Sequence, residues 1–185
     1  MNYWQSDLVR LRGVEPEDGE IFWRWNQDSE MARDLDFVWP PVSVAQVRRW
    51  AASTAEKKLE GDSFNWVIEN SEGMQVGFVH THSCHFRSGI FKYGVGVEAR
   101  HRRKGYAASA ILLVLRYYFQ ELRYQKVNVQ MHSENGASRA LHERLGFVHE
   151  GTIRRAVFTG GRYLDELCYG LTVEEWEQRY GEAGR

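Results

Sequence analysis

A dense basic turn lies in a chain that is otherwise nearly neutral. Positions 100–104 hold four cations, Arg100, Arg102, Arg103 and Lys104, whereas the 185 residues together carry a formal net charge of -1. The turn comes directly before a run with helical spacing, where unpaired N–H groups and the helix dipole favour an anion. Gly105 and the small Ala107 let phosphate oxygens approach the backbone closely. These features predict a site for a diphosphate or a phosphate ester.

Two common phosphate-binding loops do not fit this segment. The chain has no Gly-x-x-x-x-Gly-Lys-Ser/Thr sequence, which excludes the loop of nucleoside-triphosphate enzymes. No Gly-x-Gly-x-x-Gly opens a helix, so a dinucleotide-binding fold is not expected either. The plainer alternative is a solvated basic turn that caps a buried helix.

The turn resembles the pyrophosphate loop of the GNAT superfamily of N-acetyltransferases. That loop reads Gln/Arg-x-x-Gly-x-Gly/Ala, and residues 102–107 match it. A second segment, 135–151, resembles the Asn-x-x-Ser…Arg-Leu-Gly-Phe-x-x-Glu-Gly pattern of the Rim-type branch, the ribosomal-protein N-terminal acetyltransferases and their relatives. Residues 8–12 and 161–166 are similar to the same branch. The resemblance therefore covers essentially the whole chain.

This resemblance implies an enzyme, an acyltransferase that moves the acetyl group of acetyl-CoA to a primary amine. The expected acceptor is the α-amine of a peptide or protein N-terminus, and the alternative is a small polyamine or an amine-bearing metabolite or antibiotic. A non-catalytic sensor that binds CoA is an alternative of another class. The residues that the resemblance assigns to the co-substrate are Val95, Val97, Arg102, Arg103, Lys104, Gly105, Tyr106, Ala107, Asn135 and Ser138.

In the GNAT family the pantetheine arm lies where two parallel strands splay beside a bulge. That place maps onto residues 93–97 and 127–129. The backbone N–H of Val97 or of a neighbour is expected to polarise the thioester carbonyl. Gly94 and Gly96 suit a bulge because glycine tolerates unusual backbone angles. The alternative is that both glycines relieve packing against a helix.

Ser138 and His142 are the predicted catalytic residues, because the departing thiolate needs a proton. Ser138 resembles the serine proposed as the proton donor in some Rim-type enzymes. His142 stands where many GNAT enzymes have a tyrosine acid, and it follows Asn135 by seven residues, which places it over the same helix face. A histidine can donate a proton near neutral pH. A plain helix serine and a half-buried polar filler are the alternatives, so the identity of the acid stays open.

No general base stands out in the sequence. Some Rim-type relatives have a carboxylate at the position that aligns near Val157, so that carboxylate is missing here. The remaining candidates for the base are Glu98, Glu150 and Asp165. An α-amino group has a pKa of about 7.7–8.0, against about 10.4 for a lysine-type amine. An N-terminal α-amine therefore needs a dedicated base less, which favours it as the acceptor.

The acceptor site of the GNAT fold maps onto two segments, residues 34–39 and the hairpin 158–163. Asp34 and Asp36 offer negative charge to a cationic amine, and Phe37 and Trp39 offer aromatic faces. The alternative is a surface loop whose aromatic rings pack on the core. No metal is expected, since His80, His82, Cys84 and His85 match no common zinc spacing.

A mixture of helices and strands must position these residues. Apolar side chains recur at helical spacing from position 107 to 118 and alternate from 127 to 131. Strands are expected at 8–12, 64–69, 75–84, 90–97, 126–131, 147–158 and 162–171, helices at 18–26, 44–59, 105–122 and 136–145, and a loop at 27–42. This order predicts a single α/β domain over residues 1–185. The resemblance implies a three-layer GNAT sandwich (α+β) with a central mixed, mostly antiparallel sheet of about seven strands, splayed at the middle, and about four helices.

Composition narrows the remaining classes of function. With 43% hydrophobic and 14% aromatic residues, the chain can build a core and global disorder is not expected. A nucleic-acid footprint would be confined to one basic turn, and the net charge of -1 is negative, which argues against a nucleic-acid-binding module. The longest apolar runs, such as 111–115, are too short to span a bilayer, and residues 1–5 do not resemble a signal peptide.

Cysteine content and the C-terminal aromatics bear on location and assembly. Cys84 and Cys168 make no disulfide framework, so we expect a cytoplasmic protein. The resemblance implies an enzyme with an amine-bearing substrate, and neither a nucleic-acid nor a membrane partner is expected. Relatives in the GNAT family are often dimers, and Trp176 and Tyr180 are candidates for a homodimer interface. The sequence alone leaves the oligomeric state open.

Overall fold

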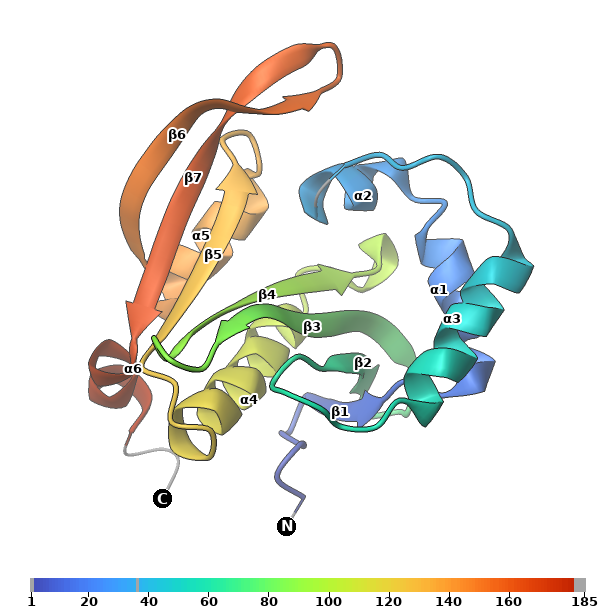
Figure 1. Cartoon of the computed structure of the whole chain (residues 1–185), viewed down its shortest axis with the longest axis horizontal. Helices are drawn as coiled ribbons and strands as arrows, with labels where there is room; N and C mark the ends of the chain where they lie inside the picture. The colour runs from blue at the N-terminus through green and yellow to red at the C-terminus, as the bar shows by residue number, and fades with distance from the viewer. Residues whose placement is uncertain (1, 36, 182–185) are drawn as a thin grey trace. The chain divides into compact units, whose positions relative to one another are not determined.

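Seven strands form one sheet in the order β1-β2-β3-β4-β5-β7-β6 (Figure 1). The computed structural model describes residues 2–35 and 37–181. β4 and β5 are parallel, whereas β1 with β2, β2 with β3, β5 with β7 and β6 with β7 are antiparallel. The strands are β1 (Val9–Gly13), β2 (Asn65–Asn70), β3 (Gln75–His85), β4 (Ile90–Val97), β5 (Lys126–His132), β6 (Val148–Thr159) and β7 (Arg162–Thr172). The predicted mixed, mostly antiparallel sheet of seven strands is confirmed.

The described residues contain six α-helices, two more than expected. They are α1 (Gly19–Trp25), α2 (Ser29–Leu35), α3 (Val44–Glu56), α4 (Tyr106–Gln120), α5 (Gly136–Leu145) and α6 (Val173–Tyr180), with short 3-10 helices η1 (Pro16–Asp18) and η2 (Ala99–His101). Ser43 caps α3, since its Oγ accepts the N–H of Gln46 at 3.2 Å. α3 ends at Glu56 rather than at the predicted residue 59. Leu59 is 86% exposed, so no packing holds a further turn.

The prediction of a loop over residues 27–42 is wrong at α2. Asp28 caps this helix, because its Oδ1 accepts the N–H groups of Glu30 and Met31 at 3.0 Å. Met31 is the one buried residue of the helix. A seven-residue helix with a single buried side chain has no apolar stripe, so its sequence carries no helical period.

The sequence interpretation also missed α6. Thr172 and Glu175 form a capping box: Thr172 Oγ1 accepts the N–H of Glu175 at 3.3 Å and Glu175 Oε2 accepts that of Thr172 at 2.8 Å. Trp176 is buried in the chain's own core, 5.7 Å from Phe119 between ring centroids. Trp176 therefore does not serve a subunit interface, and a homodimer stays a prediction. Tyr180 donates to the carbonyl of Leu145 at 3.2 Å.

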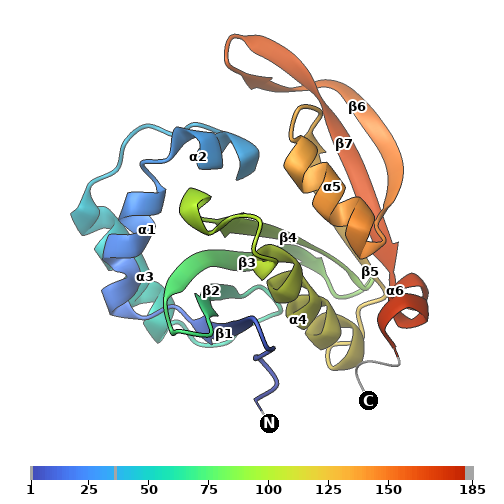
Figure 2. The ribbon, with the colours of Figure 1, turned by 180° about the vertical axis from the view of Figure 1, so that it is seen from behind.

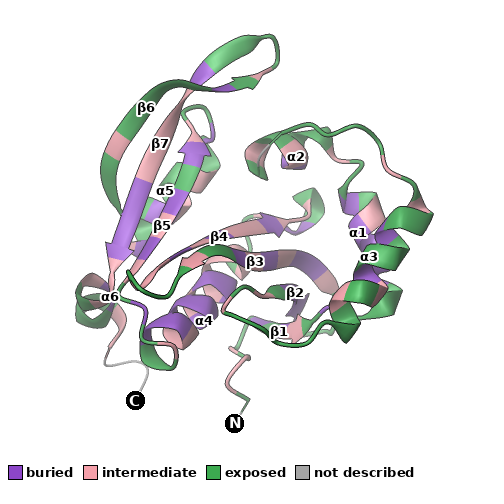
Figure 3. Cartoon of the chain, viewed as in Figure 1, coloured by how far each residue is buried: buried purple, intermediate pink, exposed green. Residues whose placement is uncertain are grey.

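The backbone falls into two compact units. Unit one comprises Met1–Thr81 and Gly94–Leu113, and unit two comprises His82–Tyr93 and Val114–Arg185. β4 and α4 contribute to both, and much of α4 is buried (Figure 3). The earlier prediction of a single domain over residues 1–185 stays a prediction.

Each unit has apolar packing of its own. A buried cluster of unit one joins its helices to β2 and comprises Val14, Ile21, Phe22, Trp25, Met31, Val47, Ala51 and Val67. In unit two Phe91 stacks on Tyr118 with ring centroids 3.9 Å apart, and the ring of Tyr124 meets Phe91 edge-on. α5 lies along one face of β5 and β7 (Figure 2). The registered pairs of β4 and β5 join residues 90–92 to 126–128, and both strands continue beyond them, to Val97 and His132.

Candidate active site

The basic turn of unit one has an unusual backbone. Arg103 has φ 62° and Gly105 has φ 85°, so two of the four residues before α4 are left-handed. Glycine adopts this conformation freely, whereas a residue with a Cβ pays about 1–2 kcal/mol for it. Turns of this kind direct successive N–H groups into a concavity that suits anions. The side chains of Arg103 and Lys104 are exposed at the start of α4, where a phosphate can reach them.

Arg102, in the same turn, makes contacts within the protein. Its Nε donates to the carbonyl oxygen of Val97 at 3.2 Å. Its Nη1 lies 3.8 Å from a carboxylate oxygen of Glu30 and 4.0 Å from one of Asp34, both on α2. The Arg102 guanidinium therefore connects the end of β4 to α2, the helix that carries an acceptor-site candidate.

The glycines of β4 are explained by packing against β3. A Cβ at Gly94 would lie 2.5 Å from the His80 ring, and one at Gly96 would lie 2.9 Å from the Phe78 ring. Neither glycine has a positive φ, so neither supplies the unusual backbone expected of a bulge. The alternative, relief of packing, accounts for both glycines, with a strand rather than a helix as the neighbour. Val95 and Val97 are half-buried on the same strand.

In unit two, α5 brings the other predicted residues together. Asn135 is buried, and its Oδ1 caps the helix by accepting the N–H of Ser138 at 2.9 Å. Ser138 is half-buried one turn into the helix. His142 lies a further turn along, with its Nδ1 2.8 Å from the carbonyl oxygen of Ser138 and 3.3 Å from Ser138 Oγ. Ser138 and His142 therefore lie on one face of α5.

The sequence analysis did not single out Tyr93 of β4, which hydrogen-bonds to His142. The Tyr93 hydroxyl lies 2.9 Å from His142 Nε2, and both side chains are buried. Burial lowers the pKa of His142 to about 4, although the hydrogen bond to the Ser138 carbonyl opposes that shift. Burial also raises the pKa of Tyr93 well above its usual value. Near neutral pH the imidazole is therefore uncharged and the phenol keeps its proton.

Each candidate base already has an ion-pair or hydrogen-bond partner. Glu98 pairs with Arg100 at 3.0 Å, and Glu150 pairs with Lys126 at 2.5 Å. Asp165 accepts the backbone N–H of Arg155 at 2.8 Å. Each of these carboxylates already compensates a positive charge or an N–H group.

The acceptor-site candidates are at the surface. Phe37 and Trp39 are 41% and 68% exposed, so their rings do not pack on the core as the alternative held. Asp34 is half-buried near Arg102, and Asp36 lies outside the described residues. In the β6–β7 hairpin Phe158 and Tyr163 are both more than half exposed, with ring centroids 5.0 Å apart.

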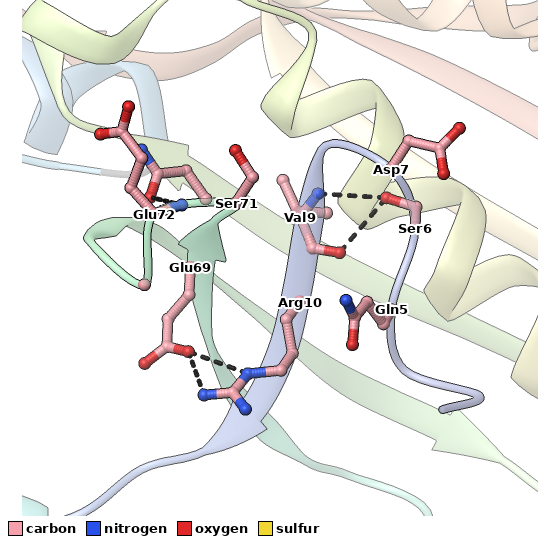
Figure 4. A pocket seen from close by; sticks show the side chains of 10 residues that line it. Gln5, Ser6, Asp7, Val9, Arg10, Glu69, Ser71 and Glu72 are labelled. Carbon is pink, nitrogen blue, oxygen red and sulfur yellow. Dashed lines mark hydrogen bonds and ion pairs between the residues drawn. The ribbon is translucent and has the colours of Figure 1, made fainter. Parts of the chain in front are cut away.

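A pocket of about 410 Å³ in unit one lies elsewhere, at the outer edge of the sheet (Figure 4). Figure 4 shows the Arg10 guanidinium hydrogen-bonded to Glu69 at its wall. The ten lining residues are Gln5, Ser6, Asp7, Val9, Arg10, Glu69, Asn70, Ser71, Glu72 and Gly73. None of them is a predicted site residue, so this pocket is not assigned to the chemistry.

The described residues contain neither a candidate metal cluster nor a candidate membrane-spanning helix. Between residues 2 and 181, position 36 excepted, no group of three or more His, Cys, Asp or Glu could hold a metal ion. Within the same ranges, no helix combines the length and the apolar character needed to cross a membrane.

Comparison with known proteins identifies the class of this chain as an acetyltransferase. The family model described as "Acetyltransferase (GNAT) domain" matches residues 9–148, so the chain belongs to the GNAT acetyltransferase family. The protein is thus an acetyl-CoA-dependent N-acetyltransferase, as predicted.

Relatives match over nearly the full chain. The SPbeta prophage-derived uncharacterized N-acetyltransferase YokL of Bacillus subtilis is 40% identical over 98% of this chain and 99% of its own. YdaF of the same species, named as a candidate ribosomal N-acetyltransferase, is 28% identical over 93% of this chain and 95% of its own. The crystal structure of spermidine N-acetyltransferase from Vibrio cholerae in complex with CoA and spermine has a TM-score of 0.80 at 20% identity, over 91% of this chain and 97% of that one.

Proposed function

We propose that this N-acetyltransferase, as a member of the Rim-type branch, acetylates the α-amine of a peptide or protein N-terminus. The observation that carries the proposal is that each candidate base, Glu98, Glu150 and Asp165, already has an ion-pair or hydrogen-bond partner. An acceptor whose pKa is about 7.7–8.0 is partly neutral near physiological pH without a dedicated base. The name of YdaF supports the same acceptor class.

Each residue that the GNAT resemblance assigns to the co-substrate has a proposed role in holding it. Arg103 and Lys104, with the N–H groups of Gly105, Tyr106 and Ala107, bind the diphosphate. Arg102 supports the turn through its bond to the Val97 carbonyl. The backbone beside Val95 and Val97 receives the thioester, and Asn135 contacts the pantetheine arm.

The transfer needs one proton to move. The amine nitrogen forms a bond to the acetyl carbon while the bond from that carbon to sulfur breaks. In the net reaction the amine loses one proton and the sulfur gains one, which gives the free thiol of CoA. The Ser138 hydroxyl gives its proton to the departing thiolate and takes up the proton that the amine loses, so the hydroxyl is restored.

A polyamine acceptor is the second candidate, and the charge of α2 favours it. Glu30 and Asp34 lie one turn apart beside Arg102, and the Glu30 side chain is 80% exposed. Exposed carboxylates of this kind attract a cationic amine. The Vibrio cholerae relative was solved with spermine, which supports the same class.

A thiol-release assay with matched acceptors tests the choice. The panel holds a peptide with a free N-terminus, the same peptide acetylated at that end, spermine, and an aminoglycoside. We expect the free peptide to give a kcat/KM at least tenfold above that of spermine, and the blocked peptide to give no turnover. An equal or higher value for spermine would overturn the N-terminal assignment.

A further inference from the structure

Three side chains of unit two form a line of hydrogen bonds that ends at Ser138. The Tyr93 hydroxyl lies 2.9 Å from His142 Nε2, and His142 Nδ1 lies 2.8 Å from the carbonyl oxygen of Ser138. The same Nδ1 is 3.3 Å from Ser138 Oγ. The line joins β4 to α5 across 49 positions of the sequence.

Donor and acceptor chemistry assigns the protons in this line. A carbonyl oxygen can only accept, so His142 Nδ1 carries the proton that bonds to it. The neutral ring then has a lone pair on Nε2, which accepts the Tyr93 O–H. The depressed pKa of His142 and the raised pKa of Tyr93 agree with this assignment.

No proton of His142 is left for a ligand. Its single N–H faces the carbonyl oxygen and the hydroxyl of Ser138, and its other nitrogen accepts the Tyr93 hydroxyl. The neighbours that face the ring are Tyr93 and Phe147, the latter edge-on with centroids 5.0 Å apart. Desolvation and the Ser138 hydrogen bond account for the pKa of His142, so no charged group sustains an imidazolium here.

The bond geometry also orients the Ser138 hydroxyl. Because Nδ1–H faces Ser138 Oγ as well as the carbonyl, the hydroxyl oxygen accepts from the ring side. Its own O–H then points away from His142. Hydrogen bonds that follow one another in such a chain polarise and strengthen each other.

We propose that Tyr93 and His142 are positioning residues that present the Ser138 hydroxyl as the donor to the CoA sulfur, and that His142 is not the general acid. The inference rests on the proposed function of Ser138. It changes the predicted role of His142 from a catalytic to a supporting one and adds Tyr93 to the site.

Nuclear magnetic resonance of the full chain tests the proton assignment without any turnover. Long-range ¹H–¹⁵N spectra of histidine-labelled protein distinguish the two neutral tautomers and the imidazolium. His142→Gln identifies the resonances among the seven histidines. We expect a neutral ring with the proton on Nδ1 at pH 6.5–8, and a shifted Nε2 signal in Tyr93→Phe. A proton on Nε2, or a charged ring at pH 6.5, would overturn the assignment even if no acceptor is ever found.

Kinetics test the supporting role. We expect Tyr93→Phe to lower kcat three- to tenfold while the KM for acetyl-CoA stays within twofold. His142→Gln should lower kcat and leave the shape of the pH–rate profile unchanged. A true general acid contributes about 10²–10⁴-fold, so a loss of that size with the disappearance of one limb of the profile would make His142 the acid.

Tyr169→Phe is the matched control. The Tyr169 hydroxyl also bonds to α5, at 2.9 Å from Glu143 Oε1, but it stands outside the line. We expect this variant to keep kcat within twofold. An equal loss of kcat in Tyr169→Phe and Tyr93→Phe would show that the effect comes from helix packing, and it would overturn the proposal.

Discussion

At the scale of single residues, Arg103 combines a charge that we propose binds the diphosphate with a strained backbone. Its φ of 62° is in the left-handed region, where a side chain is disfavoured, yet its guanidinium stands at the start of α4. Binding and stability therefore make opposite demands at this position.

Arg103→Gly should separate these two demands. We expect the free energy of unfolding to rise by about 1 kcal/mol, because glycine relieves the left-handed backbone. The same change should raise the KM for acetyl-CoA several-fold, since one diphosphate contact is lost. Arg123→Gly is the control, as Arg123 is exposed with φ 59° in another turn. A gain in KM for Arg123→Gly as well would contradict the assignment of the diphosphate to the basic turn.

Glu69 is the residue for which pH dependence is clearest. Burial alone would raise the pKa of Glu69, but hydrogen bonds and charge from Arg12 and Arg10 outweigh it and hold that pKa below its usual range. Arg12 also makes two hydrogen bonds to the buried carboxylate of Asp18. The carboxylate therefore stabilises the fold above the ordinary glutamate pKa, and this stability is lost as pH falls through the lowered value.

Glu69→Gln should show that sign in urea unfolding. At pH 7 we expect the variant to lose about 1–3 kcal/mol of unfolding free energy, because charged hydrogen bonds are replaced by weaker ones. The difference from the parent should shrink as pH falls through the lowered pKa of Glu69, where the parent carboxylate becomes protonated. A difference that is constant with pH would mean that the pKa of Glu69 is not lowered.

At the scale of elements, β3 and β4 of unit one approach each other closely at Gly77. A Cβ at Gly77 would lie 2.1 Å from the carbonyl oxygen of Gly96, and backbone cannot move aside as a side chain can. This contact requires glycine at position 77 for the two strands to stay together.

Gly77→Ala should therefore cost more than about 3 kcal/mol, within the range of overpacked or strained sites. Gly13→Ala, in β1, is the matched strand control, because a Cβ there meets nothing within 4 Å. We expect the control to change stability by less than about 0.5 kcal/mol. Thermal and urea unfolding of both variants give the comparison, and equal costs would rule out the close approach as the reason.

At the scale of the whole molecule, the binding of CoA should stabilise the folded chain. Free ligand at a hundredfold excess over Kd adds about 2.7 kcal/mol to the free energy of unfolding. We expect CoA to raise Tm, and pantetheine, which lacks the diphosphate, to raise it far less. Equal shifts for the two ligands would show that the basic turn contributes little to affinity.

Local patterns were enough to locate most elements. The bounds of β4 and α5 agree with those expected from the sequence. The residues that mark these bounds are close neighbours along the chain, so a local pattern is enough to find them. The basic turn before α4 was visible for the same reason. α2 was missed because it buries one side chain, and α6 was missed although its Thr-x-x-Glu capping box was present.

The order of charges, glycines and apolar residues along the chain thus determined the family, the sheet and the region proposed to bind the diphosphate. The tertiary structure alone decided what surrounds each side chain. In the folded chain Arg102 lies beside α2, and side chains of β3 pack on Gly94 and Gly96. His142 hydrogen-bonds to Tyr93. Burial and a partner 49 positions away set the charge and tautomer of His142, and no local spacing encodes either.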